Sequence, residues 1–304
     1  MTDGILNINK SCGPTSHDVV SRVRKLIDMR RVGHAGTLDP LATGILLVCV
    51  GRATRVVEYL MDRRKVYRAR VRLGIVTNTY DAEGQVVAES KVEVGRDQVE
   101  RTLEQFRGEI VQIPPMYSAV KHEGMPLYQL ARQGIEVERE PRQVEVFRLD
   151  LVAWEPPKCT LEVVCSRGTY VRALAHDLGQ ALGCGAYLTG LVRLASGDFR
   201  LEDAVTMDQL ARIAAAGDWS DVLHPIDAAL TSFPALQLDE EDARRLCAGQ
   251  SVSSLGQIHP VERVEDMMAR VYKLDGTFLA LATYDSTADV WRPRKVFYTL
   301  ECFS

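Results

Sequence analysis

The chain has 304 residues, a formal net charge of −4 at neutral pH and a hydrophobic fraction of 46%. This length suffices for one large domain or for a large and a small one, and the composition is ordinary for a water-soluble globular protein. The sequence has neither an apolar stretch that could span a bilayer nor a secretory leader pattern, so we expect a cytoplasmic protein with no membrane attachment.

The cysteines and acidic residues give no indication of a metal centre. The 7 cysteines are odd in number, scattered and never spaced C-x-x-C, which favours free thiols over a disulfide framework or a zinc site. The sequence also lacks a metal-ligand cluster and a Walker-type phosphate loop. We therefore expect chemistry that needs no metal or other cofactor.

The chain opens with an alternating segment, residues 4–9, that predicts a strand. Thr15 or Ser16 can cap the helix that follows, and Asp18 is favourably placed in its first turn. The apolar residues of that helix recur along one stripe, which predicts that it covers a core.

Residues 33–44, GHAGTLDPLATG, combine glycines, a proline and one carboxylate directly before an apolar run at 45–50. The glycines permit close backbone approach, and Pro40 disfavours a helical conformation at Asp39. A plain Asp-Pro turn is the simplest interpretation. Because no second acid lies nearby, a reactive Asp39 would be a solitary nucleophile or base at the entry to a buried strand.

The charged residues cluster in spite of the small net charge. Two basic clusters, at 22–31 and 63–72, flank Asp39, and an acidic cluster lies at 239–242. We interpret the acidic cluster as a solvated face and the basic ones as a surface that follows phosphates. Any nucleic-acid site must therefore be a local patch.

The middle of the chain alternates between helical and strand patterns. Residues 54–62 and 97–106 predict helices, and residues 67–73 give the cleanest period-two strand pattern. By pattern alone Tyr67 is a core aromatic of that strand. Residues 114–142 read as a long loop with a short helix, which in a compact domain is often functional.

Paired strands are predicted at 143–154 and 159–165, a helix at 171–183, a strand at 187–194 and a helix at 201–216. His176 lies on the first of these helices, and we interpret it as a structural histidine with satisfied hydrogen bonds. Beyond Pro234 short strands are indicated near 252, 264, 271–274 and 278–282. A basic tail with Trp291 follows, which fits either RNA binding or a packed edge strand.

Residues 33–44 closely resemble the motif G-H-x-G-x-L-D-P-x-A-T-G of the TruB family of tRNA pseudouridine-55 synthases. Further segments similar to this family lie at 77–84 and 166–172 and extend the resemblance over most of the chain. The resemblance implies an α+β pseudouridine-synthase fold, with a mixed, mainly antiparallel sheet flanked by helices. It implies a catalytic domain at 1–230 with a mobile RNA-binding arm at about 114–142, and a small PUA-like β-barrel at 231–304.

The resemblance also implies roles for individual residues. Asp39 is the catalytic aspartate, Arg172 pairs with it, and Tyr67 stacks on the target uracil and assists loss of its C5 proton. A buried carboxylate does need a paired cation to stay ionised. Residues implied to contact the RNA are His34, Tyr170, Leu191, Lys10, Lys121, Arg132, Arg142 and Arg193, with a structural role near the site as the alternative for Lys10. The family pattern is broken by Ser11 in place of a proline and by Val192 in place of an arginine.

The implied reaction converts the uridine at position 55 in the T-loop of tRNA to pseudouridine after the base has flipped out. Asp39 either attacks C1′ or removes the C2′ proton, and the sequence leaves both routes open. The implied enzyme is a monomer without a guide RNA or an obligate protein partner. Three other functions stay open: a non-catalytic tRNA-binding or folding protein, a nucleosidase using one carboxylate, and a synthase for a different RNA.

Overall fold

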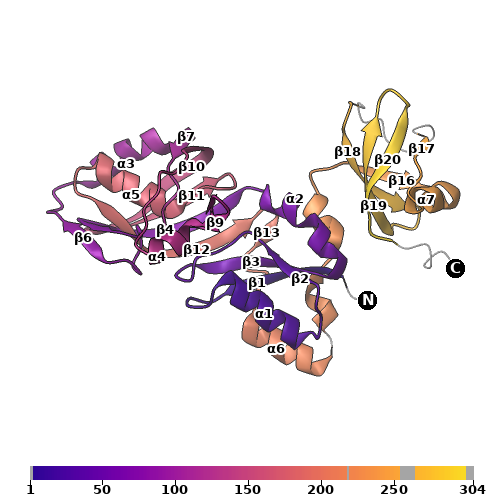
Figure 1. The fold of residues 1–304 in the computed structure, drawn as a ribbon, viewed down its shortest axis with the longest axis horizontal. Coiled ribbons are helices and arrows are strands. Elements are labelled where there is room, and N and C mark those ends of the chain that lie inside the picture. Colours follow the sequence, from indigo (N-terminus) through magenta and orange to yellow (C-terminus); the bar gives the residue numbers. More distant parts are fainter. Residues whose placement is uncertain (1–2, 218, 254–263, 299–304) are drawn as a thin grey trace.

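The computed structural model describes residues 3–217, 219–253 and 264–298. Figure 1 shows a long, twisted main sheet with helices packed along it, and a smaller sheet at the C-terminal end of the chain. Across the described residues no helix is long and apolar enough to cross a membrane.

The main sheet has 11 strands, eight of them in the order β14-β1-β3-β12-β4-β11-β10-β7. Most neighbours are antiparallel, while β1–β14 and β3–β12 are parallel, so the predicted mixed, mainly antiparallel sheet is confirmed. The strands are β1 (Gly4–Lys10), β2 (Val32–Ala35), β3 (Thr43–Val50), β4 (Lys65–Leu73), β7 (Gly108–Gln112), β10 (Arg142–Glu155), β11 (Lys158–Cys165), β12 (Ala186–Ser196), β13 (Phe199–Arg200), β14 (Val205–Thr206) and β15 (Leu223–His224).

The predicted helix caps explain where several helices begin. Thr15 and Asp18 form a capping box at the start of α1 (Ser16–Leu26). In Figure 1, α1 and α6 lie beside each other, whereas α3 and α5 lie at the other half of the sheet. The remaining helical segments are η1 (Gly51–Val56), α2 (Val57–Met61), α3 (Arg96–Leu103), η2 (Glu104–Phe106), α4 (Leu127–Arg132), α5 (Val171–Ala181), α6 (Met207–Ala216), η3 (Trp219–Val222) and η4 (Ile226–Leu230).

Two predicted helices differ from those observed. The helix predicted at 201–216 begins only at Met207, because Thr206 and Gln209 form a capping box there and residues 205–206 pair with β1. The segment predicted at 54–62 begins earlier, as η1, and becomes α2 only at Val57. Both differences concern where the elements begin.

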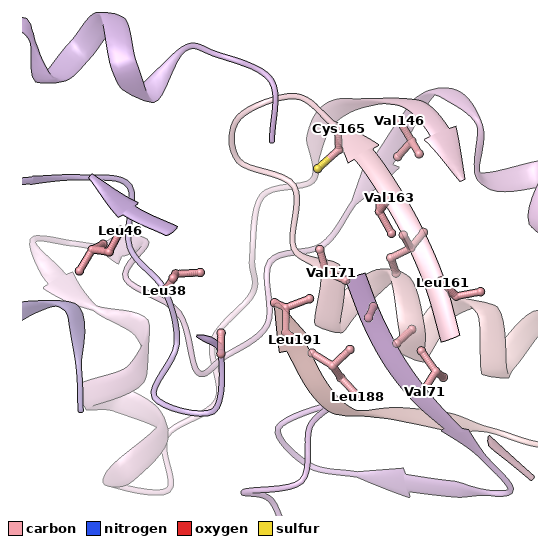
Figure 2. Packing of buried hydrophobic residues seen from close by; sticks show 14 of the residues in the cluster. Leu38, Leu46, Val71, Val146, Leu161, Val163, Cys165, Val171, Leu188 and Leu191 are labelled. Atoms are coloured by element: carbon pink, nitrogen blue, oxygen red, sulfur yellow. The ribbon is translucent and has the colours of Figure 1, made fainter. Parts of the chain in front are cut away.

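One continuous hydrophobic core joins both halves of the main sheet. Figure 2 shows the side chains of Val71, Leu161 and Leu188 on three neighbouring strands, and they belong to the same cluster as Val171 at the start of α5. The same cluster contains Leu38, which is 3% exposed. Since burial of such a side chain contributes about 1.5–3 kcal/mol, this packing fixes the residue directly before Asp39.

The two halves of the main sheet meet where β3 and β12 pair over only two positions, Val192↔Thr43 and Arg193↔Gly44. Gly44 has φ 94°, and a Cβ there would lie 2.3 Å from the carbonyl oxygen of Arg193. Only glycine therefore permits this close approach. The loop that carries Asp39 ends at this junction between the two halves.

The C-terminal sheet has the order β16-β18-β19-β20-β17 and forms its own hydrophobic cluster. Trp291 is 3% exposed within that cluster, so the packed-strand interpretation of this residue is confirmed, although β20 is paired on both sides and is not an edge strand. Its elements are β16 (Ala235–Leu238), α7 (Glu240–Cys247), β17 (Val252–Ser253), β18 (Met268–Lys273), β19 (Phe278–Asp285) and β20 (Val290–Val296).

Of two further sequence predictions for this part of the chain, one is wrong and one is confirmed. Val264, predicted on a strand, lies outside any strand and is 63% exposed. The acidic cluster at 239–242 is exposed at residues 239–241, so its interpretation as a solvated face is confirmed. It also forms the start of α7, where the side chain of Asp239 accepts a hydrogen bond from the Asp242 amide. Acidic residues there also complement the helix dipole.

Contacts of the C-terminal sheet with η1 and α2 join it to the main sheet. Leu281 and Phe297 belong to a hydrophobic cluster with Ile5, Ile45 and Leu60. Polar contacts surround this cluster, including the ion pair between Lys295 and Glu58 at 2.6 Å. The smaller sheet therefore shares apolar packing with the larger one.

Candidate active site

The loop between β2 and β3 holds Asp39 through buried hydrogen bonds. The Ser16 side chain accepts from the Leu38 amide at 2.9 Å and donates to the Leu38 carbonyl at 3.1 Å. The Gly13 amide donates to the Pro40 carbonyl at 3.0 Å. The sequence suggested Ser16 only as a helix cap, so its role in fixing this loop was missed.

Lys10 is also part of this scaffold. It is fully buried, and its Nζ donates to the carbonyls of Ala42 at 2.7 Å and Pro40 at 3.2 Å. Of the two roles expected for Lys10, the structure favours the structural one over the RNA contact, because the ammonium group already binds backbone oxygens away from solvent. Lys10 instead shapes the backbone on both sides of Leu41.

Asp39 forms an ion pair with Arg172, the second residue of α5. Nε of Arg172 lies 2.9 Å from Oδ2 of Asp39, and Nη2 lies 3.2 Å from Oδ1. The Arg172 side chain is 5% exposed and that of Asp39 is 37% exposed. The pair is thus bidentate, with a buried guanidinium and a carboxylate that still reaches open space.

The same guanidinium has three further partners. Its Nη1 lies 3.2 Å from Oδ2 of Asp81 and donates to the Thr79 carbonyl at 3.3 Å. Its Nη2 also donates to the Tyr117 carbonyl at 2.8 Å. Arg172 therefore links the Asp39 loop to the turn at 77–84 and to the first residues of the arm. Asp81, for which a turn or a basic partner was expected, is buried and is held as well by the Thr79 hydroxyl at 2.6 Å.

Burial raises the pKa of the Asp39 carboxyl, and the nearby Asp81 acts in the same direction, while Arg172 and Lys10 oppose the shift. A carboxylate in this setting is more basic than one in water. It is therefore suited to act as a base or a nucleophile at neutral pH, with Arg172 favouring its charged form.

A cavity of about 270 Å³ opens beside Asp39. Its volume lies just below the range of typical ligand pockets, about 300–1,000 Å³, so it suits one small ring. Burial raises the pKa values of the Tyr67 and Tyr170 phenols, which keeps both rings neutral. The lining includes Asp39, Tyr67, Tyr170, Arg172, Leu191 and Arg193.

Tyr170 is held by a residue that the sequence did not single out. The Gln112 side chain donates to the Tyr170 carbonyl at 3.2 Å and accepts from the Tyr170 amide at 3.0 Å. Gln112 is itself buried at the end of β7. The side-chain amide of Gln112 thus fixes the backbone directly before α5. Arg172, which pairs with Asp39, is the second residue of that helix.

Arg193 lines the cavity but is 1% exposed. Its guanidinium donates to the carbonyls of Ile45 at 2.6 Å and Gly36 at 3.2 Å. The structure does not support the expected phosphate contact, because these carbonyls hold the group inside the protein. Like Lys10, Arg193 fastens the segment that carries Asp39.

A second cavity of about 950 Å³ shares the wall formed by Asp39 and Arg172. His34 lines this cavity, and burial lowers the pKa of its imidazole, so the ring is neutral at physiological pH. The lining also includes His17, Asn78, Glu83, Tyr128 and Arg132. Asp39 thus lines both cavities, whereas His34 lines only the larger cavity and the two tyrosines line only the smaller one.

The arm carries cations that the structure leaves exposed, namely Lys121, Arg132 and Arg142. Lys121 lies in the short hairpin of β8 (Lys121–His122) and β9 (Met125–Pro126), and Arg132 lies over the Tyr128 ring. None of the three lines the smaller cavity. They are placed to meet a ligand at the rim of the larger cavity or beyond it.

The basic clusters at 22–31 and 63–72 are less available than their sequence suggested. Arg22 pairs with Asp208 at 3.2 Å, and Arg68 pairs with Glu162 at 3.4 Å. Lys65 is buried, with backbone carbonyls as its partners. Within the residues that the model describes, no cluster of His, Cys, Asp and Glu side chains could hold a metal ion.

Comparison with known proteins adds independent evidence to this geometry. The model of the TruB family pseudouridylate synthase N-terminal domain matches residues 24–171. The model of the tRNA pseudouridylate synthase B C-terminal domain matches residues 172–231. The first matched segment therefore contains Asp39, and the second begins at Arg172, the ion-pair partner of Asp39.

Two curated relatives are named tRNA pseudouridine synthase B. The protein from Dehalococcoides mccartyi is 45% identical over 296 residues, which cover 97% of this chain and 96% of the relative. The protein from Pseudomonas paraeruginosa is 49% identical over 252 residues, covering 82% and 83% of the two chains. In the crystal structure of a Cbf5-Nop10-Gar1 complex, a chain 26% identical superposes with a TM-score of 0.77, over 99% of this chain and 86% of that one.

Proposed function

This chain belongs to the TruB family and is a tRNA pseudouridine synthase, and we propose that it modifies the uridine at position 55 in the T-loop with Asp39 as the reacting group. The observation that carries the proposal is the bidentate pair of Asp39 and Arg172 on the wall between two cavities. A binding protein has no need of a buried guanidinium that keeps a partly exposed carboxylate charged.

The target base enters the smaller cavity after it leaves the RNA stack. That cavity offers two neutral phenol rings and the apolar side chain of Leu191, which suit the faces of a pyrimidine. The larger cavity receives the RNA around the extruded nucleotide, and there the neutral His34 takes the place of the displaced base.

Asp39 starts the exchange of the N-glycosidic bond for a C–C bond. As a nucleophile it bonds to C1′ while the uracil leaves with the bonding electron pair; as a base it takes the C2′ proton and leaves a glycal. The base then turns and its C5 bonds to C1′, as the Asp39–C1′ bond breaks or, on the glycal route, as Asp39 returns the proton to C2′. The C5 proton departs with the help of Tyr67, and N1 of the base takes up a proton. Tyr67 lines the same cavity as Asp39, so both groups reach one bound base.

The chain has two functional parts, which act as one monomer without a guide RNA. Residues 1–230 form the catalytic domain, with the arm at about 114–142, and residues 231–304 form a PUA-like RNA-binding domain. The separate five-stranded sheet supports this division. Purified protein should sediment as a monomer and modify tRNA without added RNA or protein.

Site-resolved mapping of pseudouridine on tRNA treated with the purified chain tests the proposed function. We expect one new pseudouridine, at position 55, and an unchanged RNA mass, because the reaction is an isomerisation. Release of uracil with loss of RNA mass would indicate a nucleosidase. Binding without any modification would indicate an RNA-binding or folding protein, and modification elsewhere would indicate a different RNA target.

A further inference from the structure

A stacked pair of rings, from Tyr80 and His176, lies beside the Arg172 cluster. The two ring centroids are 3.9 Å apart and the planes are inclined by 17°. Tyr80 belongs to the turn at 77–84, and His176 belongs to α5. These are the two segments that carry Asp81 and Arg172, yet neither ring lines either cavity.

The backbone of Tyr80 is held in an uncommon conformation. Its φ is 65°, a left-handed value that disfavours a bulky residue. The Tyr80 carbonyl accepts from the Leu188 amide at 3.0 Å. A Cβ at Gly84 would lie 2.2 Å from the Thr79 hydroxyl, so the turn closes tightly. This shape directs the Thr79 carbonyl and the Asp81 carboxylate toward one point.

That point is occupied by the guanidinium of Arg172, which binds both groups. His176 lies four residues after Arg172 and therefore on the same face of α5, one turn further along. The turn thus contacts α5 at two places, through an ion pair at Arg172 and through a ring stack at His176.

The contact at His176 depends on stacking. Its Nδ1 is buried without a hydrogen-bond partner among the described residues, contrary to the expectation of a satisfied histidine. Burial also lowers the pKa of this imidazole, so the ring stacks in its neutral form. An aromatic ring without nitrogen could therefore take its place.

We propose that Tyr80 and His176 are positioning residues for the reaction. Their stack fixes the separation between the turn and α5, and thereby the direction in which Arg172 presents its guanidinium to Asp39. This inference rests on the proposed function and adds to it. Displacement of a catalytic group by about 1 Å can slow a reaction about a hundredfold, so loss of the stack should affect rate far more than tRNA affinity.

The test compares full-length variants in single-turnover formation of pseudouridine and in tRNA binding. The variants are His176→Ala, Tyr80→Ala, His176→Leu, His176→Phe and Tyr80→Phe. A matched control is His224→Ala, since His224 meets the Phe199 ring edge-on at 5.0 Å and lines neither cavity.

We expect the alanine and leucine variants to lose about tenfold or more in rate, with tRNA affinity within about twofold of wild type. The two phenylalanine variants should react at close to the wild-type rate, and the control His224→Ala should react at the wild-type rate. Because the rings act as a pair, the double alanine variant should lose little more than the more affected single one. His176→Leu keeps the volume of the ring and serves as the test if the alanine variants fail to fold.

Three results would overturn the inference: full rate in His176→Leu, a His176→Phe variant as slow as His176→Leu, or additive losses in the double variant. Each of these three results counts against the inference only if the wild-type chain is active on the same tRNA. An inactive wild-type chain would instead refute the proposed function, so the two failures are distinguishable.

Discussion

The Asp39 loop and the arm at 114–142 border the same larger cavity but are fastened in opposite ways. The loop is held by Lys10, Ser16 and Arg193, all buried and bound to backbone atoms. The arm keeps Lys121, Arg132 and Arg142 exposed and meets the site through the bond from Arg172 to the Tyr117 carbonyl. Buried cations therefore shape the catalytic backbone, and exposed ones remain free for phosphates.

Arg172→Met should break this arrangement most severely. Removing a preorganised charge partner of the reacting group typically costs about a hundredfold or more in rate. Because Arg172 lowers the pKa of Asp39 against the effect of burial, its loss should raise that pKa further. Asp39 must be ionised to react, so the acid limb of the rate profile should move to higher pH. Single-turnover rates between pH 5 and 8 measure both effects, and an unmoved acid limb would contradict the assignment.

Lys10→Met should have the next largest effect, on folding as well as on rate. It leaves buried carbonyls such as that of Ala42 without their donor, which costs about 1–3 kcal/mol per group in the free energy of unfolding. Displacement of the loop should also slow the reaction by about tenfold or more. Denaturant unfolding and kinetics measure these losses. Lys158→Met, at the exposed start of β11, is the control and should change neither.

Replacing Lys121, Arg132 and Arg142 together by alanine should weaken tRNA binding while the rate at saturating tRNA is kept. Three lost phosphate contacts should reduce the slope of log affinity against log salt by about two to three. Fluorescence titrations at several salt concentrations provide the measurement. If the saturating rate falls instead, with an unchanged salt slope, the arm and the Asp39 loop do not divide their tasks as described.

Arg132→Ala alone should have the smallest effect, about twofold to fivefold in tRNA affinity, because an exposed cation contributes about 1 kcal/mol or less. The same titration at one salt concentration checks it. If Arg132→Ala instead lost as much reaction rate as Arg172→Met, Arg132 would belong to the catalytic cluster. The contrast between buried and exposed cations would then fail.

Local patterns in the sequence foretold most of the fold. The alternation of β4, the cap at Thr15 and the strand before Pro156 all depend on neighbouring residues, and they appear where predicted. The start of α6 was misplaced because Thr206, rather than an earlier residue, supplies its cap. The helix α7 was missed because its acidic start resembles an ordinary solvated run.

The site was harder to foresee where distant segments decide a residue's surroundings. The resemblance implied RNA contacts for Lys10, with a structural role as the alternative, and for Arg193, but both are fully buried, which is rare for such residues. Their partners are carbonyls of Ala42 and Ile45, 32 and 148 residues away, and no local pattern reveals them. The amide of Gln112, which holds Tyr170 from 58 residues away, was missed for the same reason.

The most direct test of the account is Asp39→Asn, assayed for tRNA binding and for single-turnover formation of pseudouridine. The amide keeps the size of the side chain but can neither attack C1′ nor take the C2′ proton. We predict tRNA affinity close to that of wild type and no pseudouridine at position 55. Pseudouridine formed at that position by the purified variant would contradict the central role of this carboxylate.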